Sequence, residues 1–260
     1  MRVQCKTQNT AEWFAARCGK VTASKIADAA ARLSKKSKNG EKGDWAAAHT
    51  SYVSQLALEL VTRTPGEHYV SKPMEIGAQY EGEARIEYWM RYGTDVDETG
   101  FVLHPALDWL GASPDGLVGI DGGIEIKVPL LETHWGYLID DEIPKNYQMQ
   151  MQCGMLCCER EWWDFVSYCP PDIAPELPDE FRMFCKRLHA DEAVFIEIEE
   201  AATKTIEEAA AMVESLRKKY PRVEYVNARP VKQQDDYTAE EVSDFTGDAY
   251  AFVDDISLTP

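Results

Sequence analysis

The sequence lacks any apolar run long enough to cross a bilayer, and residues 1–6 lack the apolar stretch of a signal peptide. It contains no Cys-x-x-Cys pair, and its seven cysteines are an odd number in a 260-residue chain. A disulfide framework is therefore not expected, and the pattern is typical of a reducing cytoplasm. Positive charge is also scarce, because 27 Lys and Arg stand against 45 Asp and Glu, for a net charge of −18.

This charge balance argues against a surface that attracts nucleic acid over its whole area, because phosphate binding depends on Lys and Arg. The charge is unevenly placed, however. A basic segment contains Arg32, Lys35, Lys36, Lys38 and Lys42, whereas the chain is strongly acidic from Asp235 to its last residue. A protein that encloses DNA needs positive charge only along the enclosed path. The composition therefore does not exclude a nucleic-acid ligand.

The length suits one large α/β domain with a terminal appendage, which we place at residues 1–220 and 221–260. Hydrophobic periodicity predicts helices capped by Thr10 and Thr22, and further helices over 45–61, 74–92, 145–158 and 199–219. Alternating or continuous apolar runs predict strands over 96–103, 109–112, 116–120, 124–128, 163–169 and 195–198. The segment beyond Pro221 is expected to be an irregular acidic extension.

The most informative stretch, residues 111–129, joins Ser-Pro-Asp-Gly to Glu-x-Lys on a short apolar strand. Its two apolar runs flank Asp-Gly-Gly at 121–123 and predict a hairpin. Side chains alternate along a strand, so Glu125 and Lys127 share a face. A two-residue turn would place Asp115 on the opposite face. A three-residue loop, which pairs Gly119 with Glu125 and Ile120 with Ile124, places Asp115 on the same face, and the second glycine favours this loop.

Two carboxylates and one lysine on one face predict a metal-dependent nuclease site. Mg²⁺ prefers one or two carboxylates together with waters and phosphate oxygens, and Asp115 and Glu125 supply that pair. A bound metal lowers the pKa of its water, and Lys127 can hold that water or offset developing negative charge. Glu-x-Lys alone is common on ordinary surface hairpins. The Ser-Pro-Asp-Gly half favours the metal site over that alternative.

A cluster of cysteines, Cys153, Cys157 and Cys158, lies on one predicted helix. It allows two interpretations, an iron–sulfur site or buried thiols at helical spacing. The second is favoured, because free cysteine behaves as a small buried hydrophobe.

Several motifs together resemble the phage lambda-type exonucleases of the PD-(D/E)xK superfamily. The resemblance extends over about 13–219 and rests on five motifs in the family's order. These are Arg-Cys-Gly-Lys-Val-Thr-Ala-Ser at 17–24, Gly-Ala-Gln-Tyr-Glu-Gly-Glu-Ala-Arg at 77–85, Ser-Pro-Asp-Gly-Leu at 113–117, Glu-Ile-Lys at 125–127 and Tyr-Gln-Met-Gln-Met-Gln at 147–152. Each motif is weak alone, but their order and separations make the set specific. The acidic segment 235–260 departs from the family pattern.

The resemblance implies a restriction-endonuclease-like α/β core, with a central mixed β-sheet flanked by helices. It implies a processive, Mg²⁺-dependent 5′-to-3′ exonuclease on linear double-stranded DNA that releases mononucleotides and leaves a 3′ overhang. One or two ions per subunit are expected, with Mn²⁺ able to substitute. The implied partners are double-stranded DNA ends, further copies of the chain in a homotrimeric ring, and a phage-type single-strand annealing protein. The implied location is the cytoplasm of a bacterium or a phage-infected host.

Residue roles follow from the matched positions. Asp115, Glu125 and the main-chain carbonyl of Ile126 match metal ligands, and Lys127 matches the catalytic lysine. Glu81 matches a helical carboxylate that helps to organise the metal site, although an i,i+4 pair with Arg85 is the ordinary alternative. Gln150 matches a glutamine near the attacking water, and two further glutamines, Gln148 and Gln152, flank it.

A second set of matched positions concerns the DNA. The 5′-phosphate pocket would comprise Arg17, Thr22, Ser24 and Ser113. A helix N-terminus and a guanidinium both favour an anion, whereas a routine cap with a surface arginine is the alternative. Met74 matches an apolar wedge between terminal base pairs, with core packing as its rival. The basic residues expected along the DNA are Lys72, Arg32, Lys35 and Lys36.

Three rival functions remain open at this point. One is an iron–sulfur exonuclease of the same superfamily that uses the cysteine cluster. Another is a catalytically inactive DNA-end-binding module, against which the intact Asp115, Glu125 and Lys127 argue. The third is a sequence-specific restriction enzyme, which would not require the motif at 17–24.

Overall fold

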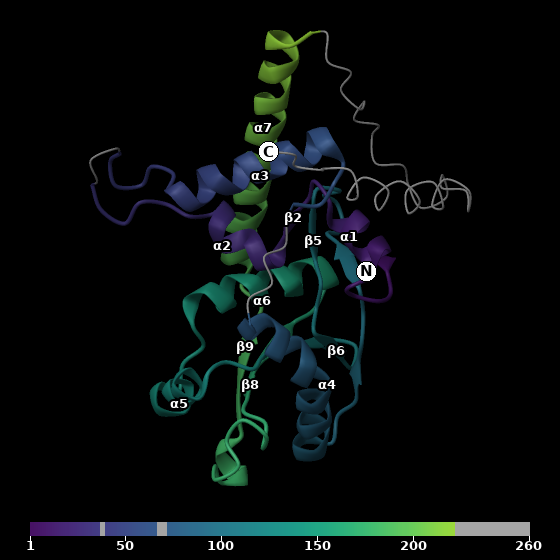
Figure 1. Cartoon of the computed structure of the whole chain (residues 1–260), viewed down its shortest axis with the longest axis vertical. Helices are drawn as coiled ribbons and strands as arrows, with labels where there is room; N and C mark the ends of the chain where they lie inside the picture. The colour runs from purple at the N-terminus through teal and green to yellow at the C-terminus, as the bar shows by residue number, and fades with distance from the viewer. Residues whose placement is uncertain (37–39, 67–71, 222–260) are drawn as a thin grey trace, which may run out of the picture. The chain divides into compact units, whose positions relative to one another are not determined.

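Two mixed β-sheets organise the computed structural model, which describes residues 1–36, 40–66 and 72–221, the first three residues of the last range by their backbone alone (Figure 1). The first sheet has the order β1 (Arg2–Cys5), β4 (Phe101–Leu103), β5 (Leu110–Ala112) and β2 (Val21–Thr22). The second has the order β3 (Val96–Asp97), β6 (Gly116–Val118), β7 (Gly122–Lys127), β8 (Trp162–Tyr168) and β9 (Met183–His189). Only the β2–β5 and β7–β8 pairs among these strands are parallel. The predicted α/β class with mixed sheet and flanking helices is confirmed.

Six longer helices accompany these sheets. They are α1 (Ala11–Arg17), α3 (Ala47–Thr62), α4 (Lys72–Tyr92), α5 (Leu131–Asp140), α6 (Lys145–Cys158) and α7 (Glu192–Lys219). Short turns of helix complete the described part, namely η1 (Ala23–Lys25), α2 (Ile26–Ala29) and η2 (Asp179–Phe181). Thr10 caps α1 as predicted, because its side chain accepts from the N–H of Trp13 at 3.2 Å. None of the helices in the described residues is long and apolar enough to span a membrane.

The hairpin that carries the motif has a three-residue loop, but at 119–121 rather than 121–123. Gly116 pairs with Ile124 and Val118 with Gly122, so the predicted pairing of Ile120 with Ile124 is wrong by four residues. The left-handed residue is Gly119, at φ 58°. An even shift returns every side chain to the same face, and the predicted grouping of Asp115 with Glu125 and Lys127 therefore survives.

The glycines that were assigned to the turn lie instead in β7, beneath two tryptophans of β8. A Cβ on Gly122 would come within 2.1 Å of the Trp162 ring, and one on Gly123 within 2.5 Å of the Trp163 ring. Both pairs are direct neighbours in the parallel β7–β8 ladder. The two glycines are therefore needed for close packing rather than for the turn.

Three further predictions of local structure differ from the structure. Residues 195–198 belong to α7, because Asp191 caps that helix through a 2.9 Å bond from the N–H of Ala193. Thr22 lies in β2 and makes no side-chain cap bond, and the helix after it is only a turn of η1 followed by one turn of α2. The predicted strand 96–103 is divided between β3 and β4, which belong to different sheets.

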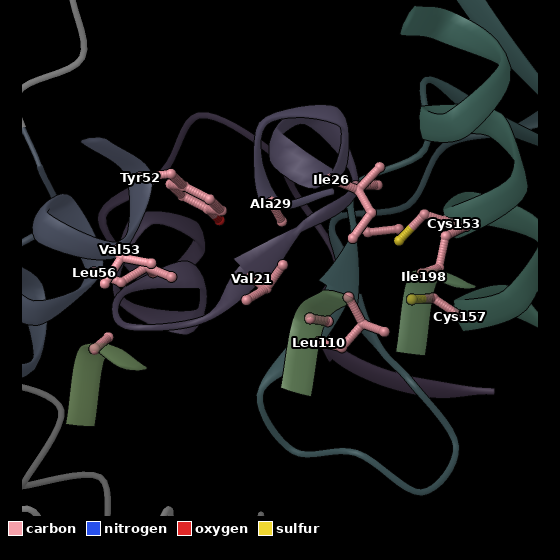
Figure 2. Packing of buried hydrophobic residues seen from close by; sticks show 14 of the residues in the cluster. Val21, Ile26, Ala29, Tyr52, Val53, Leu56, Leu110, Cys153, Cys157 and Ile198 are labelled. Atoms are coloured by element: carbon pink, nitrogen blue, oxygen red, sulfur yellow. The ribbon is translucent and has the colours of Figure 1, made fainter. Parts of the chain in front are cut away.

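The largest apolar cluster joins α2, α3, α6 and α7 to the first sheet. Cys153 and Cys157 point into it beside Ile26, Leu110 and Ile198 (Figure 2). Burial raises the pKa of the Cys157 thiol well above its ordinary value, and that of Cys158 to about 12. These cysteines are buried at helical spacing, Cys153 and Cys157 in this cluster and Cys158 in a neighbouring one, which is the interpretation that the sequence favours.

Packing on both faces of the second sheet fixes the position of β7. On one face, Ala84 and Tyr88 of α4 cluster with Ile124 and Ile126. A separate cluster contains Met151 and Met155 of α6 together with Trp163 and Phe165 of β8. Strand β7 consequently has α4 and α6 as neighbours, and both helices bring polar side chains to its C-terminal half.

Candidate active site

The residues of the Asp-Glu-Lys motif come together at the C-terminal half of β7. Lys127 forms an ion pair with Glu125, and its Nζ lies 4.0 Å from Oδ2 of Asp115. Asp115 lies between β5 and β6, and its Oδ2 accepts from the main-chain N–H of Ile126 at 2.7 Å. The role of the Ile126 carbonyl as a ligand remains a prediction. The expected arrangement of the three side chains is confirmed as geometry.

One of the three adjacent glutamines of α6 reaches this group. Gln150 donates from Nε2 to Oε1 of Glu125 at 2.6 Å. Gln148 instead binds the carbonyl of Ile143, and Gln152 binds the carbonyl of His189. The helix therefore presents Gln150 to the candidate site, as the resemblance implies.

Helix α4 supplies Glu81 from the other side. Arg85 donates to Oε1 of Glu81 at 2.6 Å, so the ordinary i,i+4 pair does form. The same Nη1 group also donates to the main-chain carbonyl of Asp115 at 2.8 Å. The pair is thus part of the candidate site rather than of a solvated helix surface. A cleft of about 260 Å³ lies here, lined by residues 6–9 and by Glu81 and Asp115 among others.

Burial and the proximity of the carboxylates to one another shift the pKa values of the residues in the candidate site. Burial raises the pKa of Glu125 to about 7, with Asp115 and Glu81 adding to the rise and Lys127 opposing it. Burial and Asp115 likewise raise the pKa of Glu81, against Arg85 and Lys127. Burial alone would lower the pKa of Lys127, but Glu125 and Asp115 outweigh it and hold that pKa above its ordinary value. Lys127 is therefore a cation at neutral pH.

The fit of a divalent cation follows from these donors. Hard cations take oxygen ligands, and the pKa values of Glu81 and Glu125 are raised first by burial and then by neighbouring carboxylates, whose charge a cation would offset. Within the described ranges no group of three or more His, Cys, Asp or Glu side chains is arranged to hold a metal. Mg²⁺ needs only one or two carboxylates with waters and substrate oxygens, so Asp115 and Glu125 suffice.

A second polar group lies at Ser113, two residues before Asp115. The Ser113 Oγ accepts from Nη1 of Arg17 at 2.8 Å and from Nε1 of Trp13 at 2.9 Å. The Arg17 guanidinium also lies 4.2 Å from the Trp13 ring centroid. Burial lowers the pKa of the Arg17 guanidinium, and Tyr52 and the Glu59 carboxylate oppose that shift. Both acceptor positions of Ser113 are used, and its own proton is free to be donated to an anion.

The other two expected phosphate ligands, Thr22 and Ser24, follow Arg17 in the sequence. Thr22 is buried and its Oγ1 lies 3.3 Å from Oγ of the exposed Ser24. Because the helix that follows has so few residues, its dipole contributes little. Arg17 and Ser113 remain the stronger part of the predicted pocket.

The basic residues of the predicted DNA track differ in their local contacts, and their role along DNA stays a prediction. Arg32 stacks on Trp45 at 3.7 Å from the ring centroid and donates to the carbonyl of Gly43, so its guanidinium has a local structural partner. Lys36 pairs with Glu41, and Lys35 is exposed. The side chains of Lys72 and Met74 lie outside the described residues, and the wedge prediction stays untested.

Contacts that the sequence reasoning missed hold the loop 113–115. Gln8 donates to the carbonyls of Pro114 at 2.6 Å and Thr99 at 3.0 Å. Trp13 holds Ser113 and Arg85 holds Asp115. The i,i+4 spacing of Trp13 and Arg17 could have predicted that these two side chains lie together, whereas no pattern in the sequence indicates a role for Gln8.

Comparison with known proteins gives the family. A model of the YqaJ-like viral recombinase domain matches residues 12–161, more than half of the chain. The chain belongs to this family. The resemblance to lambda-type exonucleases is thereby confirmed at the level of family.

Solved structures support the assignment. An alkaline exonuclease from Laribacter hongkongensis, LHK-Exo, is 38% identical and matches with a TM-score of 0.69, covering 82% of this chain and 98% of that chain. The same protein in complex with dAMP matches with a TM-score of 0.70, at the same identity and coverage. A phage related exonuclease from Haemophilus somnus 129PT shares the fold at 14% identity, with a TM-score of 0.62 and coverage of 76% and 96%. No curated protein matches the chain.

Proposed function

We propose that the chain is a divalent-metal-dependent exonuclease that hydrolyses the 5′-ended strand of linear double-stranded DNA to mononucleotides. The observation that carries the proposal is the segment 113–115. It joins Ser113, which contacts Arg17, to Asp115, which lies with Glu125 and Lys127. A captured 5′-phosphate at Arg17 would therefore place the adjacent phosphodiester near the carboxylates. Family membership and the likeness to an alkaline exonuclease support a nuclease.

In this proposal Asp115, Glu125 and the Ile126 carbonyl hold one or two Mg²⁺, with Mn²⁺ as a substitute. When bound, the metal supplies an activated water and screens charge on the phosphate. Lys127 remains protonated and offsets negative charge that develops during the reaction. Gln150 fixes the orientation of Glu125, and Glu81 acts indirectly. Arg17, Ser113, Ser24 and Thr22 hold the terminal phosphate, with Lys72, Met74, Lys35 and Lys36 along the DNA.

The proposal extends to assembly and context. The catalytic unit is residues 1–220, and 221–260 is an extension. Three copies form a ring around the duplex, which would give processivity, and the 3′ overhang serves recombination with a phage-type annealing protein. This activity would take place in a bacterial or phage-infected cytoplasm.

Digestion of linear duplex DNA tests the proposal. The substrate carries label at the 5′ or the 3′ end, with or without a 5′-phosphate, and each reaction is run with Mg²⁺ and with EDTA. Early, metal-dependent release of the 5′ label as mononucleotide, faster from phosphorylated ends, is expected. Cleavage without this polarity would contradict the 5′-to-3′ assignment. Binding of DNA ends without any cleavage would favour the end-binding module.

A further inference from the structure

The side chain of Arg85 contacts its own helix α4 and two other segments of the chain. Its Nη1 donates to Oε1 of Glu81 at 2.6 Å and to the carbonyl of Asp115 at 2.8 Å. Its Nη2 lies 3.2 Å from Oε1 of Glu98, in the segment between β3 and β4. A surface i,i+4 pair would connect only two residues of the helix. The bond to Asp115 therefore indicates a further role.

Both the side chain and the main chain of Asp115 accept hydrogen bonds, and the two donors belong to different elements. Its carboxylate accepts from the N–H of Ile126, which belongs to β7, and its carbonyl accepts from Arg85, which belongs to α4. The same nitrogen of Arg85 also holds the carboxylate of Glu81. One guanidinium therefore bridges Glu81 and the main chain of Asp115.

The chemistry of the side chain suits this position. The Arg85 side chain is 17% exposed and that of Glu81 31%, so their pair is partly shielded from water, whereas Glu98 is 72% exposed and its pair contributes little. A guanidinium is a rigid planar fork with several donors, and a lysine in its place could not hold two acceptors in the same geometry.

We propose that Arg85 is a positioning residue for the divalent-metal site, where it fixes Asp115 as a ligand and keeps Glu81, which acts indirectly, beside it. This inference rests on the proposed metal-dependent function. Groups that orient metal ligands typically change metal affinity or activity by about 10- to 100-fold when they are removed.

Arg91 provides a matched control on the same helix. Its Nε donates to Oε1 of Glu87 at 2.6 Å, again an i,i+4 pair, and its Nη2 donates to the carbonyl of Asp179 at 2.5 Å. It thus has the same two kinds of acceptor as Arg85. Neither acceptor belongs to the candidate metal site.

The test measures binding of Mn²⁺ alone to the full chain without DNA, by calorimetry, and the rise in Tm that Mn²⁺ causes. Arg85→Gln should raise the Kd for Mn²⁺ about tenfold or more and reduce the Tm rise, and Arg85→Lys should do so by a smaller factor. Arg91→Gln should bind Mn²⁺ as the wild type does. An unchanged Kd in Arg85→Gln, or an equal loss in Arg91→Gln, would overturn the proposal.

A second variant and a second measurement distinguish failure of the Arg85 proposal from misfolding and from failure of the proposed function. If Arg85→Gln does not fold, Arg85→Lys decides, and wild-type Mn²⁺ affinity in that variant would overturn the proposal. Duplex digestion is also measured against Mg²⁺ concentration. A wild type that shows no metal-dependent digestion would refute the proposed function, whereas wild-type digestion with an unshifted metal half-saturation in Arg85→Gln would refute only the role of Arg85.

Discussion

Gln150 of α6 donates a 2.6 Å hydrogen bond to Oε1 of Glu125 on β7, and Lys127 contacts the same oxygen. Glu125 is almost fully buried at 3% exposure, so its orientation depends on these two donors. Because a hydrogen bond to a charged group is worth about 1.5–3 kcal/mol, each donor makes a sizeable contribution to holding the carboxylate in place.

Gln150→Ala is therefore expected to slow DNA cleavage by about 10- to 100-fold, because Glu125 loses a fixed orientation. Gln148→Ala is the matched control, since Gln148 lies on the same helix but binds the carbonyl of Ile143. Single-turnover digestion of a labelled duplex measures both. Equal rates for the two variants would show that Gln150 has no special place in the reaction.

Lys127→Met is expected to reduce cleavage by at least about 100-fold, because it removes the cation that would offset charge in the transition state. Methionine keeps most of the side-chain volume, so the hairpin should fold. Binding of duplex ends, followed by fluorescence anisotropy, should change little. Lys204→Met is the control, because Lys204 pairs with Glu208 on the exposed face of α7. Near-normal turnover of Lys127→Met would refute the catalytic assignment.

The sequence was sufficient to predict the catalytic face but not the register of its hairpin. A shift of four residues is even, so Asp115 stays on the face of Glu125 and Lys127 in both three-residue loops, the predicted one and the observed one. The true register depends on Trp162 and Trp163, which cover Gly122 and Gly123 from a strand forty residues away. Local turn propensity cannot contain that information.

Tertiary packing also explains the error at 195–198. This short apolar run has strand propensity by itself, yet Ile198 is fully buried in the cluster shared by α3, α6 and α7. Packing of the whole 28-residue helix outweighs the local preference. The elements α5, β9 and β1 were not among the predicted ones. Arg85 and Trp13 could be seen as local pairs, but their contacts with 113–115 arise only in the fold.

Arg17→Gln and Ser113→Ala are expected to slow digestion of 5′-phosphorylated ends by about tenfold or more, and of hydroxyl ends much less. Each removes a donor for the terminal phosphate, and hydrogen bonds that involve charge are the stronger kind. Parallel digestions of the two substrates measure this selectivity. Arg160→Gln, at an arginine that binds the carbonyl of Gly119, serves as the control. Equal losses on both ends would contradict the phosphate pocket.

Gly123→Ala is expected to lower the free energy of unfolding by about 1–3 kcal/mol, because the new Cβ would meet the Trp163 ring at 2.5 Å. Gly136→Ala is the opposite case, since nothing lies within 4 Å of a Cβ at that position of α5. It should raise the stability by about 0.5–1 kcal/mol through its effect on the helix. Chemical denaturation of both variants measures the difference. Similar stabilities would show that the β7–β8 contact adapts freely.

His134 is expected to make the fold sensitive to mild acid. It is fully buried, its Nε2 lies 2.7 Å from the carbonyl of Phe181, and its Nδ1 lies 2.8 Å from Oγ of Ser167. Burial lowers the pKa of His134, against the opposing effect of the Phe181 carbonyl. The unfolded chain, in which this pKa is about 6.5, then binds a proton before the folded chain does. The stability is therefore fully present above pH 6.5 and is lost as the pH falls toward the folded pKa.

The loss should approach about 1.4 kcal/mol per pH unit from this residue. Urea denaturation between pH 7 and pH 5 measures the slope in the wild type and in His134→Gln, which keeps an amide donor but does not titrate. The variant should be less stable at pH 7 but should have a shallower slope. A slope that His134→Gln leaves unchanged would assign the acid sensitivity to other groups, because only a group that titrates between the two states can contribute to it.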